Sequence, residues 1–359
     1  MTEMDKRNVV DLDVVVVGGG VAGLSGALTL ARARRSVLVV DSGEPRNAPA
    51  SGVHGFLSRD GVAPSELLRA GSEEVTAYGG QIVADRAVTA CRAGERFVVD
   101  TEGGQSFSAR RLLMTTGLVD ELPEIPGLRE RWGRDVLHCP YCHGWEVRDA
   151  PIGVLATGPR AVHQALLFRQ WSADVTLFLH TGDDPDEEQW GQLAARGITV
   201  VDGEVEALEI RDDRLSGVRL VSGQRVPVRA LAVAPRFEAR GGVLSGLGLT
   251  AVEHPLGVGS HVESDASGFT GVAGVWVAGN ITDLMGGVVG AAAAGMQAAA
   301  AINADLVKAD TDAAVARRAA ARSSDVLTPA PEAANCERVL GERRHGLDGF
   351  PRPGRAAEQ

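Results

Sequence analysis

Three things are scarce or absent in this 359-residue chain. Basic residues are not in surplus: the formal net charge is −11, whereas a nucleic-acid-binding face needs Lys and Arg to neutralise phosphates. The first residues contain no apolar stretch of the kind found in secretory signals. We therefore expect a cytoplasmic protein that does not bind nucleic acid.

Long apolar segments are missing as well. The most apolar stretch runs from Gly286 to Ala301, and it is too short and too rich in Ala and Gly to span a bilayer. No membrane association is therefore expected. With 44% hydrophobic and 23% charged residues the composition is globular, and the length suits two domains of ordinary size.

Cysteine is rare, with four residues in all: Cys91, Cys139, Cys142 and Cys336. Only Cys139 and Cys142 lie close in sequence, and in a reducing cytoplasm such a pair is more often catalytic or metal-binding than structural. Cys91 follows an alternating segment and is expected to be a small core residue. Cys336 lies in a charged tail, where it is either a shuttle thiol or an idle residue.

The N-terminal segment has the pattern of a dinucleotide-binding unit. A β-branched run at residues 13–17 predicts a buried parallel strand, followed by a helix to about Arg34 and a strand at 36–40. Three glycines with G-x-G-x-x-G spacing and an acid complete the pattern: Gly18, Gly20, Gly23 and Asp41. The glycines form the turn, admit a pyrophosphate and allow close helix packing, while the acid bonds a ribose hydroxyl. This context predicts a bound dinucleotide.

A second strand–helix–strand pattern begins after Ala150, and a closing strand with an Ala-rich helix behind it follows from about residue 275 to 307. Two such units predict an α/β fold of two Rossmann-like nucleotide-binding domains, the second inserted in the first. The expected boundaries are 1–117 with 246–308 for the first domain, 118–245 for the inserted one, and 309–359 for a mobile tail.

These residues resemble the low-molecular-weight thioredoxin reductase family over about residues 10–308. The likeness rests on four motifs: Gly18–Gly23 with Asp41, Thr115-Thr116-Gly117, the Cys139–Cys142 pair, and Gly274–Asp283. Within that family, the segments 46–49, 54–56 and 139–144 are most similar to FAD-dependent dithiol oxidases of natural-product pathways, the gliotoxin and holomycin type. Such enzymes close a disulfide in a small molecule and pass the electrons to oxygen.

The resemblance implies FAD as cofactor, a small-molecule dithiol as substrate, oxygen as acceptor and a homodimer. It places further residues against the flavin cofactor: Asn47, Thr116, Gly117, Gly279 and Asn280. The family usually has Asp where Asn280 stands, and Asn can still bond ribityl hydroxyls. It also implies that Cys142 faces the flavin and that Cys139 exchanges with substrate.

The Cys139–Cys142 spacing brings two thiols within range of a small disulfide ring, which is redox geometry. If Cys142 begins a helix, the helix dipole favours its reactive thiolate. A zinc site is the structural alternative, but it needs two further ligands. No second C-x-x-C occurs, and His138 and His143 are too close along the chain to complete a tetrahedron, so no metal is expected.

Histidines surround this pair. His143 follows Cys142 where thioredoxin reductases carry an acid, and its imidazole can take a proton from an incoming thiol. The alternative, that His143 only bonds nearby backbone, weighs equally. His138 is interpreted as structural, whereas His54 and Phe56 either lie near the flavin or anchor a loop.

The second turn departs from a working pyridine-nucleotide site. It reads Ala156-Thr157-Gly158-Pro159-Arg160-Ala161, and an alanine in place of the first glycine disfavours a positive φ. NADPH-binding members of the resembled family place an arginine pair just after His180, whereas this chain has Thr181, Gly182 and an acidic loop at 183–188. A 2′-phosphate needs Arg or Lys, and five carboxylates repel it. We expect no use of NADPH; the argument against NADH is weaker.

Three functions remain on these grounds. The leading hypothesis is an FAD-dependent dithiol oxidase that produces hydrogen peroxide. The second is an NAD(P)H-dependent disulfide reductase acting on a thioredoxin-like protein, which the missing arginines disfavour. The third is a flavin-bound regulatory protein with vestigial cysteines, which the intact Cys139-Pro140-Tyr141-Cys142 motif disfavours.

Overall fold

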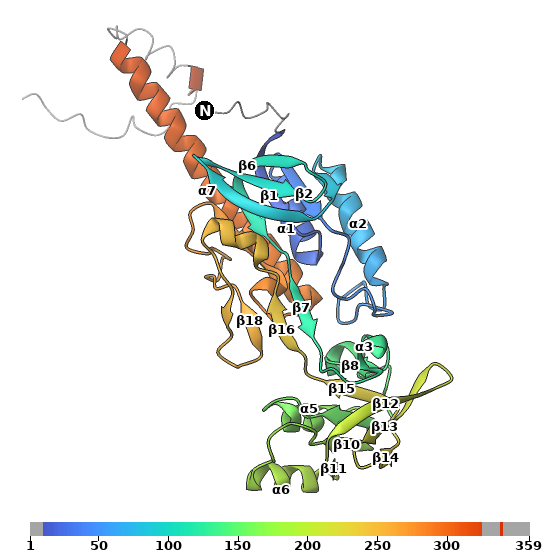
Figure 1. Cartoon of the computed structure of the whole chain (residues 1–359). Helices are drawn as coiled ribbons and strands as arrows, with labels where there is room; N and C mark the ends of the chain where they lie inside the picture. Colours follow the sequence, from blue (N-terminus) through green and yellow to red (C-terminus); the bar gives the residue numbers. More distant parts are fainter. Residues whose placement is uncertain (1–9, 325–337, 340–359) are drawn as a thin grey trace, which may run out of the picture. The chain divides into compact units, whose positions relative to one another are not determined.

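The first sheet is built on the β-branched run near the N-terminus. In the computed structural model, which describes residues 10–324 and 338–339, β1 (Val10–Val17) pairs in parallel with β2 (Val37–Asp41) and β6 (Ser106–Met114) (Figure 1). The side chains of Val14, Val15 and Val16 are fully buried, as a strand covered on both faces requires. Helix α1 (Val21–Arg32) connects β1 to β2.

Two strands extend this sheet from distant parts of the chain. β3 (Gln81–Ala84) follows helix α2 (Pro64–Ala77) and pairs with β2, and β19 (Val275–Val277) pairs with the second half of β6. All these pairs are parallel. The return of β19 to β6 means that the chain leaves this sheet and rejoins it much later.

The other edge of the sheet is antiparallel: β4 (Ala87–Ala93) pairs with β5 (Arg96–Thr101), and β5 pairs with the first half of β6. In β4 the buried side chain is Ala90, and Cys91 is exposed. The prediction that Cys91 is a core residue is therefore wrong. Successive side chains on a strand point to opposite faces, so an error of one residue in register moves every side chain to the other face.

The second sheet is wholly parallel. Its strands lie in the order β11 (Thr199–Val201), β10 (Val175–Phe178), β9 (Ile152–Leu155), β15 (Ala230–Val233) and β8 (Val136–Leu137). Helices α5 (Ala161–Phe168) and α6 (Glu187–Ala195) connect β9 to β10 and β10 to β11. An antiparallel unit accompanies it: β12 (Val205–Arg211), β13 (Arg214–Leu220) and β14 (Arg225–Val226). The predicted α/β fold with two Rossmann-type units is confirmed.

A small separate sheet contains the two places where the chain passes between these units. β7 (Leu118–Glu121) leaves the first sheet, β16 (Arg236–Ala239) returns from the second, and the two pair antiparallel. β18 (Gly259–His261) and β17 (Val252–Glu253) extend the sheet. The domain boundaries expected at residues 118 and 246 stay predictions.

The last helix is longer than the sequence suggests. α7 runs from Val288 to Ser324 and so continues past residue 309, where the tail is expected to begin. Alanine and arginine are strong helix formers, which accounts for a helix in a stretch without regular apolar periodicity. Among the described residues, those up to Ala304 form one compact unit and those from Asp305 a second. Cys336 lies outside the described residues.

Candidate functional site

The turn between β1 and α1 has the geometry that its glycines predict. Gly18 adopts a φ of +107°, and its N–H donates to the carbonyl oxygen of Val40 at 2.8 Å. A Cβ on Gly23 would overlap the carbonyl oxygen of Gly18, whereas a Cβ on Gly20 would meet nothing within 4 Å. The first and third glycines therefore shape the turn, and the second leaves open space for a ligand.

Asp41 at the end of β2 supports this turn directly. Its Oδ1 accepts from the N–H of Gly19 at 2.8 Å, and its Oδ2 accepts from the N–H of Gly43 at 3.2 Å. Thr115 supports the turn from β6: its hydroxyl lies 2.8 Å from the carbonyl oxygen of Gly18, to which it donates. The sequence marks Thr115 only as part of the Thr115-Thr116-Gly117 motif, because its partner is 97 residues away.

The opposite wall is made by the segments that follow β6 and β19. The hydroxyl of Thr116 donates to the carbonyl oxygen of Arg240 at 2.8 Å, and Gly117 adopts a φ of +70°. Gly279 has a φ of +79°, and a Cβ there would lie 2.8 Å from the Cβ of Ala22 in α1. These two glycines are therefore fixed by backbone geometry and close packing.

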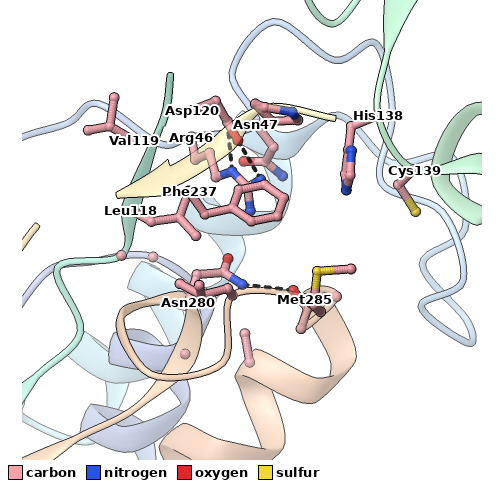
Figure 2. A pocket seen from close by; sticks show the side chains of 18 of the residues that line it. Arg46, Asn47, Leu118, Val119, Asp120, His138, Cys139, Phe237, Asn280 and Met285 are labelled. Carbon is pink, nitrogen blue, oxygen red and sulfur yellow. Dashed lines mark hydrogen bonds and ion pairs between the residues drawn. The ribbon is translucent and has the colours of Figure 1, made fainter. Parts of the chain in front are cut away.

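Asn280 uses its amide in an unexpected way. Its Nδ2 donates to the carbonyl oxygens of Asp283 (2.9 Å) and Gly286 (2.8 Å), which fastens the loop carrying Met285 (Figure 2). A carboxylate has no proton to donate, so the Asp of related chains cannot make these two bonds. Asn280 is thus a loop-fixing residue in addition to a cavity-lining one.

The paired cysteines form a disulfide. Cys139 and Cys142 have Cα atoms 5.3 Å apart, and Cys139 is the N-cap of the short helix α4 (Pro140–His143). It is therefore Cys139, not Cys142, that begins the helix. Pro140 occupies the first helical position, where its missing N–H costs no hydrogen bond.

His143 ends α4 beside the disulfide. Burial lowers the pKa of its imidazole, while the nearby carboxylate of Glu146 acts in the opposite direction. The ring is therefore neutral at pH 7, which is the state that accepts a proton. A neutral imidazole next to the disulfide fits the base role.

A polar and aromatic group faces the disulfide across the cavity. Arg46 makes a bidentate ion pair with Asp120 of β7, with N–O distances of 2.9 and 2.7 Å. The guanidinium also lies over the ring of Phe237 in β16, 5.1 Å from its centroid. Asn47 lies next to this pair (Figure 2). Arg46 thus ties both crossing strands to the loop after β2.

His138 belongs to this group. Its ring meets Phe237 edge-on at 5.2 Å, and its side chain lies beside Cys139 in the cavity (Figure 2). The interpretation of His138 as a structural residue stays a prediction, and the structure adds that the ring lies beside Cys139. Its place directly before Cys139 in the sequence was the available signal.

The second nucleotide turn differs from the first. Ala156 follows β9 as Gly18 follows β1, but its φ is not positive, and the hydroxyl of Thr157 donates to the carbonyl oxygen of Ala234 at 2.9 Å. In the acidic loop, Asp186 caps α6 by accepting from the N–H of Gln189. NADPH-binding members of the resembled family carry two arginines just after the position of His180. Thr181 and Gly182 stand there in this chain, and they cannot donate the charged hydrogen bonds that arginines make.

These walls enclose one cavity of about 1350 Å³. It brings together all the predicted cofactor and redox residues except Gly23, which packs behind the turn: Gly18, Gly20, Asp41, Asn47, Thr116, Gly117, Cys139, Cys142, His143, Gly279 and Asn280. The cavity also reaches Thr157 and Gly158 of the second turn. Within the described ranges, no group of three or more His, Cys, Asp or Glu side chains is arranged to hold a metal, and no helix is long and apolar enough to cross a membrane.

Comparison with known proteins identifies the family. Residues 12–303 match the pyridine nucleotide-disulphide oxidoreductase family. The chain belongs to that family. Among solved structures, that of HlmI is 48% identical with a TM-score of 0.81, covering 88% of this chain and 98% of its own. An oxidoreductase from Agrobacterium tumefaciens is 36% identical with a TM-score of 0.78, covering 83% and 99%.

Curated relatives of this pyridine nucleotide-disulphide oxidoreductase include two fungal proteins. The thioredoxin reductase tcpT of Claviceps purpurea is 32% identical, covering 68% of this chain and 79% of the relative. The thioredoxin reductase sirT of Leptosphaeria maculans is 30% identical, covering 83% and 95%. The predicted likeness to thioredoxin reductases is confirmed, and with it an oxidoreductase of disulfide chemistry.

Members of this family are typically FAD-binding flavoproteins, and the residues of the first turn fit that cofactor. Gly18 has the left-handed conformation that the turn requires, and Gly20 leaves room for a pyrophosphate at the start of α1. The cavity continues from this turn to the disulfide, so a long dinucleotide has space in one connected site.

Proposed function

We propose that this protein is an FAD-dependent dithiol oxidase, which forms a disulfide in a small-molecule dithiol and transfers the electrons to oxygen. One observation carries the proposal. The Cys139–Cys142 disulfide shares a single cavity with the first nucleotide turn, while the second turn lacks the left-handed residue and the segment after β10 lacks the arginine pair that NADPH needs. In this proposal the site accepts electrons from thiols, because the disulfide can exchange with them, and it binds NADPH poorly.

The proposed reaction begins with thiol–disulfide exchange between the substrate and the enzyme. One substrate thiolate bonds to a cysteine sulfur, the Cys139–Cys142 bond breaks, and the second substrate thiol displaces the first cysteine, which leaves a substrate disulfide and two enzyme thiols. FAD, when bound, would take up the two electrons and two protons released as the Cys139–Cys142 bond re-forms, and would supply the electron transfer that reduces oxygen to hydrogen peroxide. The resemblance assigns Cys142 to the flavin side and Cys139 to substrate exchange.

The rest of the site serves this chemistry in the proposal. Asn47, Thr116, Gly117, Gly279 and Asn280 hold the FAD together with the first turn. His143 accepts the proton of the incoming thiol. A homodimer is proposed by family resemblance alone, and a cytoplasmic location is proposed from the sequence.

A second candidate is an NAD(P)H-dependent disulfide reductase. The observation in its favour is that several relatives are called thioredoxin reductases. Anaerobic mixing separates the two functions. The oxidase should keep its flavin oxidised with NADPH, lose the yellow colour with dithiothreitol, and regain it in air with formation of peroxide. Rapid bleaching by micromolar NADPH would instead identify a reductase, and NADH is tested in parallel.

A further inference from the structure

His143 stands between two cavities. Besides the main cavity, it lines a smaller one of about 370 Å³, whose other walls include Glu146 and Arg134. Arg134 is engaged elsewhere, because its guanidinium pairs with Asp213. Glu146 is thus the carboxylate that shares this small cavity with the His143 ring.

Glu146 lies beside a histidine from a distant loop. The loop is closed by a bridge between Val53 and Val62. Within it, the Nδ1 of His54 lies 3.4 Å from the Oδ2 of Asp60, and its Nε2 lies 3.6 Å from the Oε1 of Glu146. The N–H of Gly55 also donates to Asp60 at 2.8 Å, so the loop itself orients the ring.

Glu146 and His54 shift the pKa of His143 in opposite directions. Burial is the main cause that lowers the pKa of His143; the anionic Glu146 raises it, and the cationic form of His54 lowers it further. Asp60 faces His54 rather than His143, since its carboxylate bonds Gly55 and His54. The charge environment of His143 is therefore set by one carboxylate and the imidazole that pairs with it.

We propose that Glu146 and His54 are positioning residues, which set the proton affinity of His143 for its reaction with the incoming thiol. This inference rests on the proposed dithiol oxidase function. In the step concerned, the substrate S–H gives its proton to His143 while its sulfur bonds to the Cys139 sulfur. The Cys139–Cys142 bond breaks, and its electron pair stays on Cys142.

The test measures anaerobic flavin reduction by dithiothreitol in rapid mixing, as a function of pH. In wild type the rate falls on the acid side as His143 becomes protonated. Glu146→Gln removes the anion, so the acid limb should move to lower pH, and the plateau rate should fall because a weaker base remains. Glu146→Asp should keep the wild-type limb.

His54→Gln gives the opposite expectation. The glutamine amide keeps a donor facing Glu146 but carries no charge, so the acid limb should move to higher pH. Glu95→Gln, an exposed carboxylate in the turn after β4, is the control and should leave the profile in place. A shift of both site variants in one direction, or no shift in either, would overturn the inference.

Failure of the proposed function has a different signature. Wild-type flavin that dithiothreitol does not reduce at any pH rejects the dithiol chemistry itself. Normal reduction with a His143→Gln profile identical to wild type rejects His143 as the base, and the positioning role with it.

Discussion

The Nδ1 atom of His138 lies 3.2 Å from the carbonyl oxygen of Val233 at the end of β15. Because a carbonyl oxygen only accepts, Nδ1 carries the proton, and the Nε2 atom of the neutral ring is the free acceptor. Burial is the largest cause that lowers the pKa of His138, with Arg46 and Arg160 adding to it. The ring beside Cys139 is thus held neutral in one tautomer.

This depressed pKa has a consequence for stability. Above the ordinary histidine pKa of 6.5, both folded and unfolded chains hold a neutral His138. As the pH falls below that value, the unfolded chain takes up the proton first, so the free energy of unfolding decreases until the folded pKa is reached. Burial also lowers the pKa values of His143 and His180, so both residues change the free energy of unfolding in the same direction.

We therefore expect the melting temperature to fall between about pH 7 and about pH 5.5, a window set by the histidine reference pKa. His138→Gln should reduce that fall by a few degrees, since it removes one of the titrating groups. Differential scanning calorimetry of both proteins at the two pH values provides the check. An equal fall in both would show that His138 does not contribute.

The glycines of the first turn should separate folding from cofactor binding. Gly23→Ala forces a Cβ onto the Gly18 carbonyl and should lower the free energy of unfolding by roughly 1–3 kcal/mol. Gly20→Ala places its Cβ in open space and should fold with a loss of about 1 kcal/mol or less, yet bind FAD weakly. Gly290→Ala in α7, where a Cβ also meets open space, is the control: it should raise the free energy of unfolding by about 0.5–1 kcal/mol and leave FAD binding unchanged.

Chemical denaturation and flavin absorbance together test this pair. A Gly23→Ala protein as stable as wild type would contradict the packing argument. A Gly20→Ala protein with full FAD content would mean that the open space beside Gly20 does not receive the pyrophosphate.

The two cysteines should differ in their spectra. If Cys142 faces the flavin, the Cys139→Ser variant keeps the Cys142 thiolate beside the flavin ring system. That variant should show long-wavelength charge-transfer absorbance, whereas Cys142→Ser should not. Both variants should keep FAD and lose turnover. Reversed spectra would exchange the two roles, and full dithiol oxidation by either variant would remove the pair from the mechanism.

The ion pair between Arg46 and Asp120 should contribute to stability, because the Asp120 side chain is only 9% exposed. A double-mutant cycle with Arg46→Met and Asp120→Asn should give a coupling energy of about 1–2 kcal/mol from urea denaturation. The more exposed pair Arg236–Glu253 is the matched comparison and should show a smaller coupling energy, because water screens it. Equal coupling energies in both pairs would show that Arg46 contributes no more to stability than an exposed arginine does.

The first nucleotide unit could be predicted from sequence because its determinants are local. Gly18, Gly20 and Gly23 lie within one turn, and their roles follow from backbone conformation alone. The disulfide between Cys139 and Cys142 was likewise accessible from spacing. The boundaries of the later helix were not, since the Ala-rich composition of α7 carries no periodic signal for its end.

The side-chain contacts in the cavity wall could not be predicted from the sequence, for a different reason. Arg46 meets Asp120 across 74 positions, and His138 meets Val233 across 95. Such contacts depend on how two sheets and their crossing strands pack, which no local pattern encodes. Asn280 shows the same limit: its residue type was visible, but its two bonds to the Met285 loop were not.

Ala156 and Gly182 set the order in which this chain could acquire an NADPH site. A Cβ added at Gly182 would lie 2.7 Å from the Cβ of Ala156, which is closer than real side chains approach. An arginine installed at position 182 alone therefore collides with the alanine that spoils the turn. A designer, or evolution, would have to change Ala156 to Gly first, a step that gains nothing on its own. Both positions must therefore change before an arginine fits at position 182.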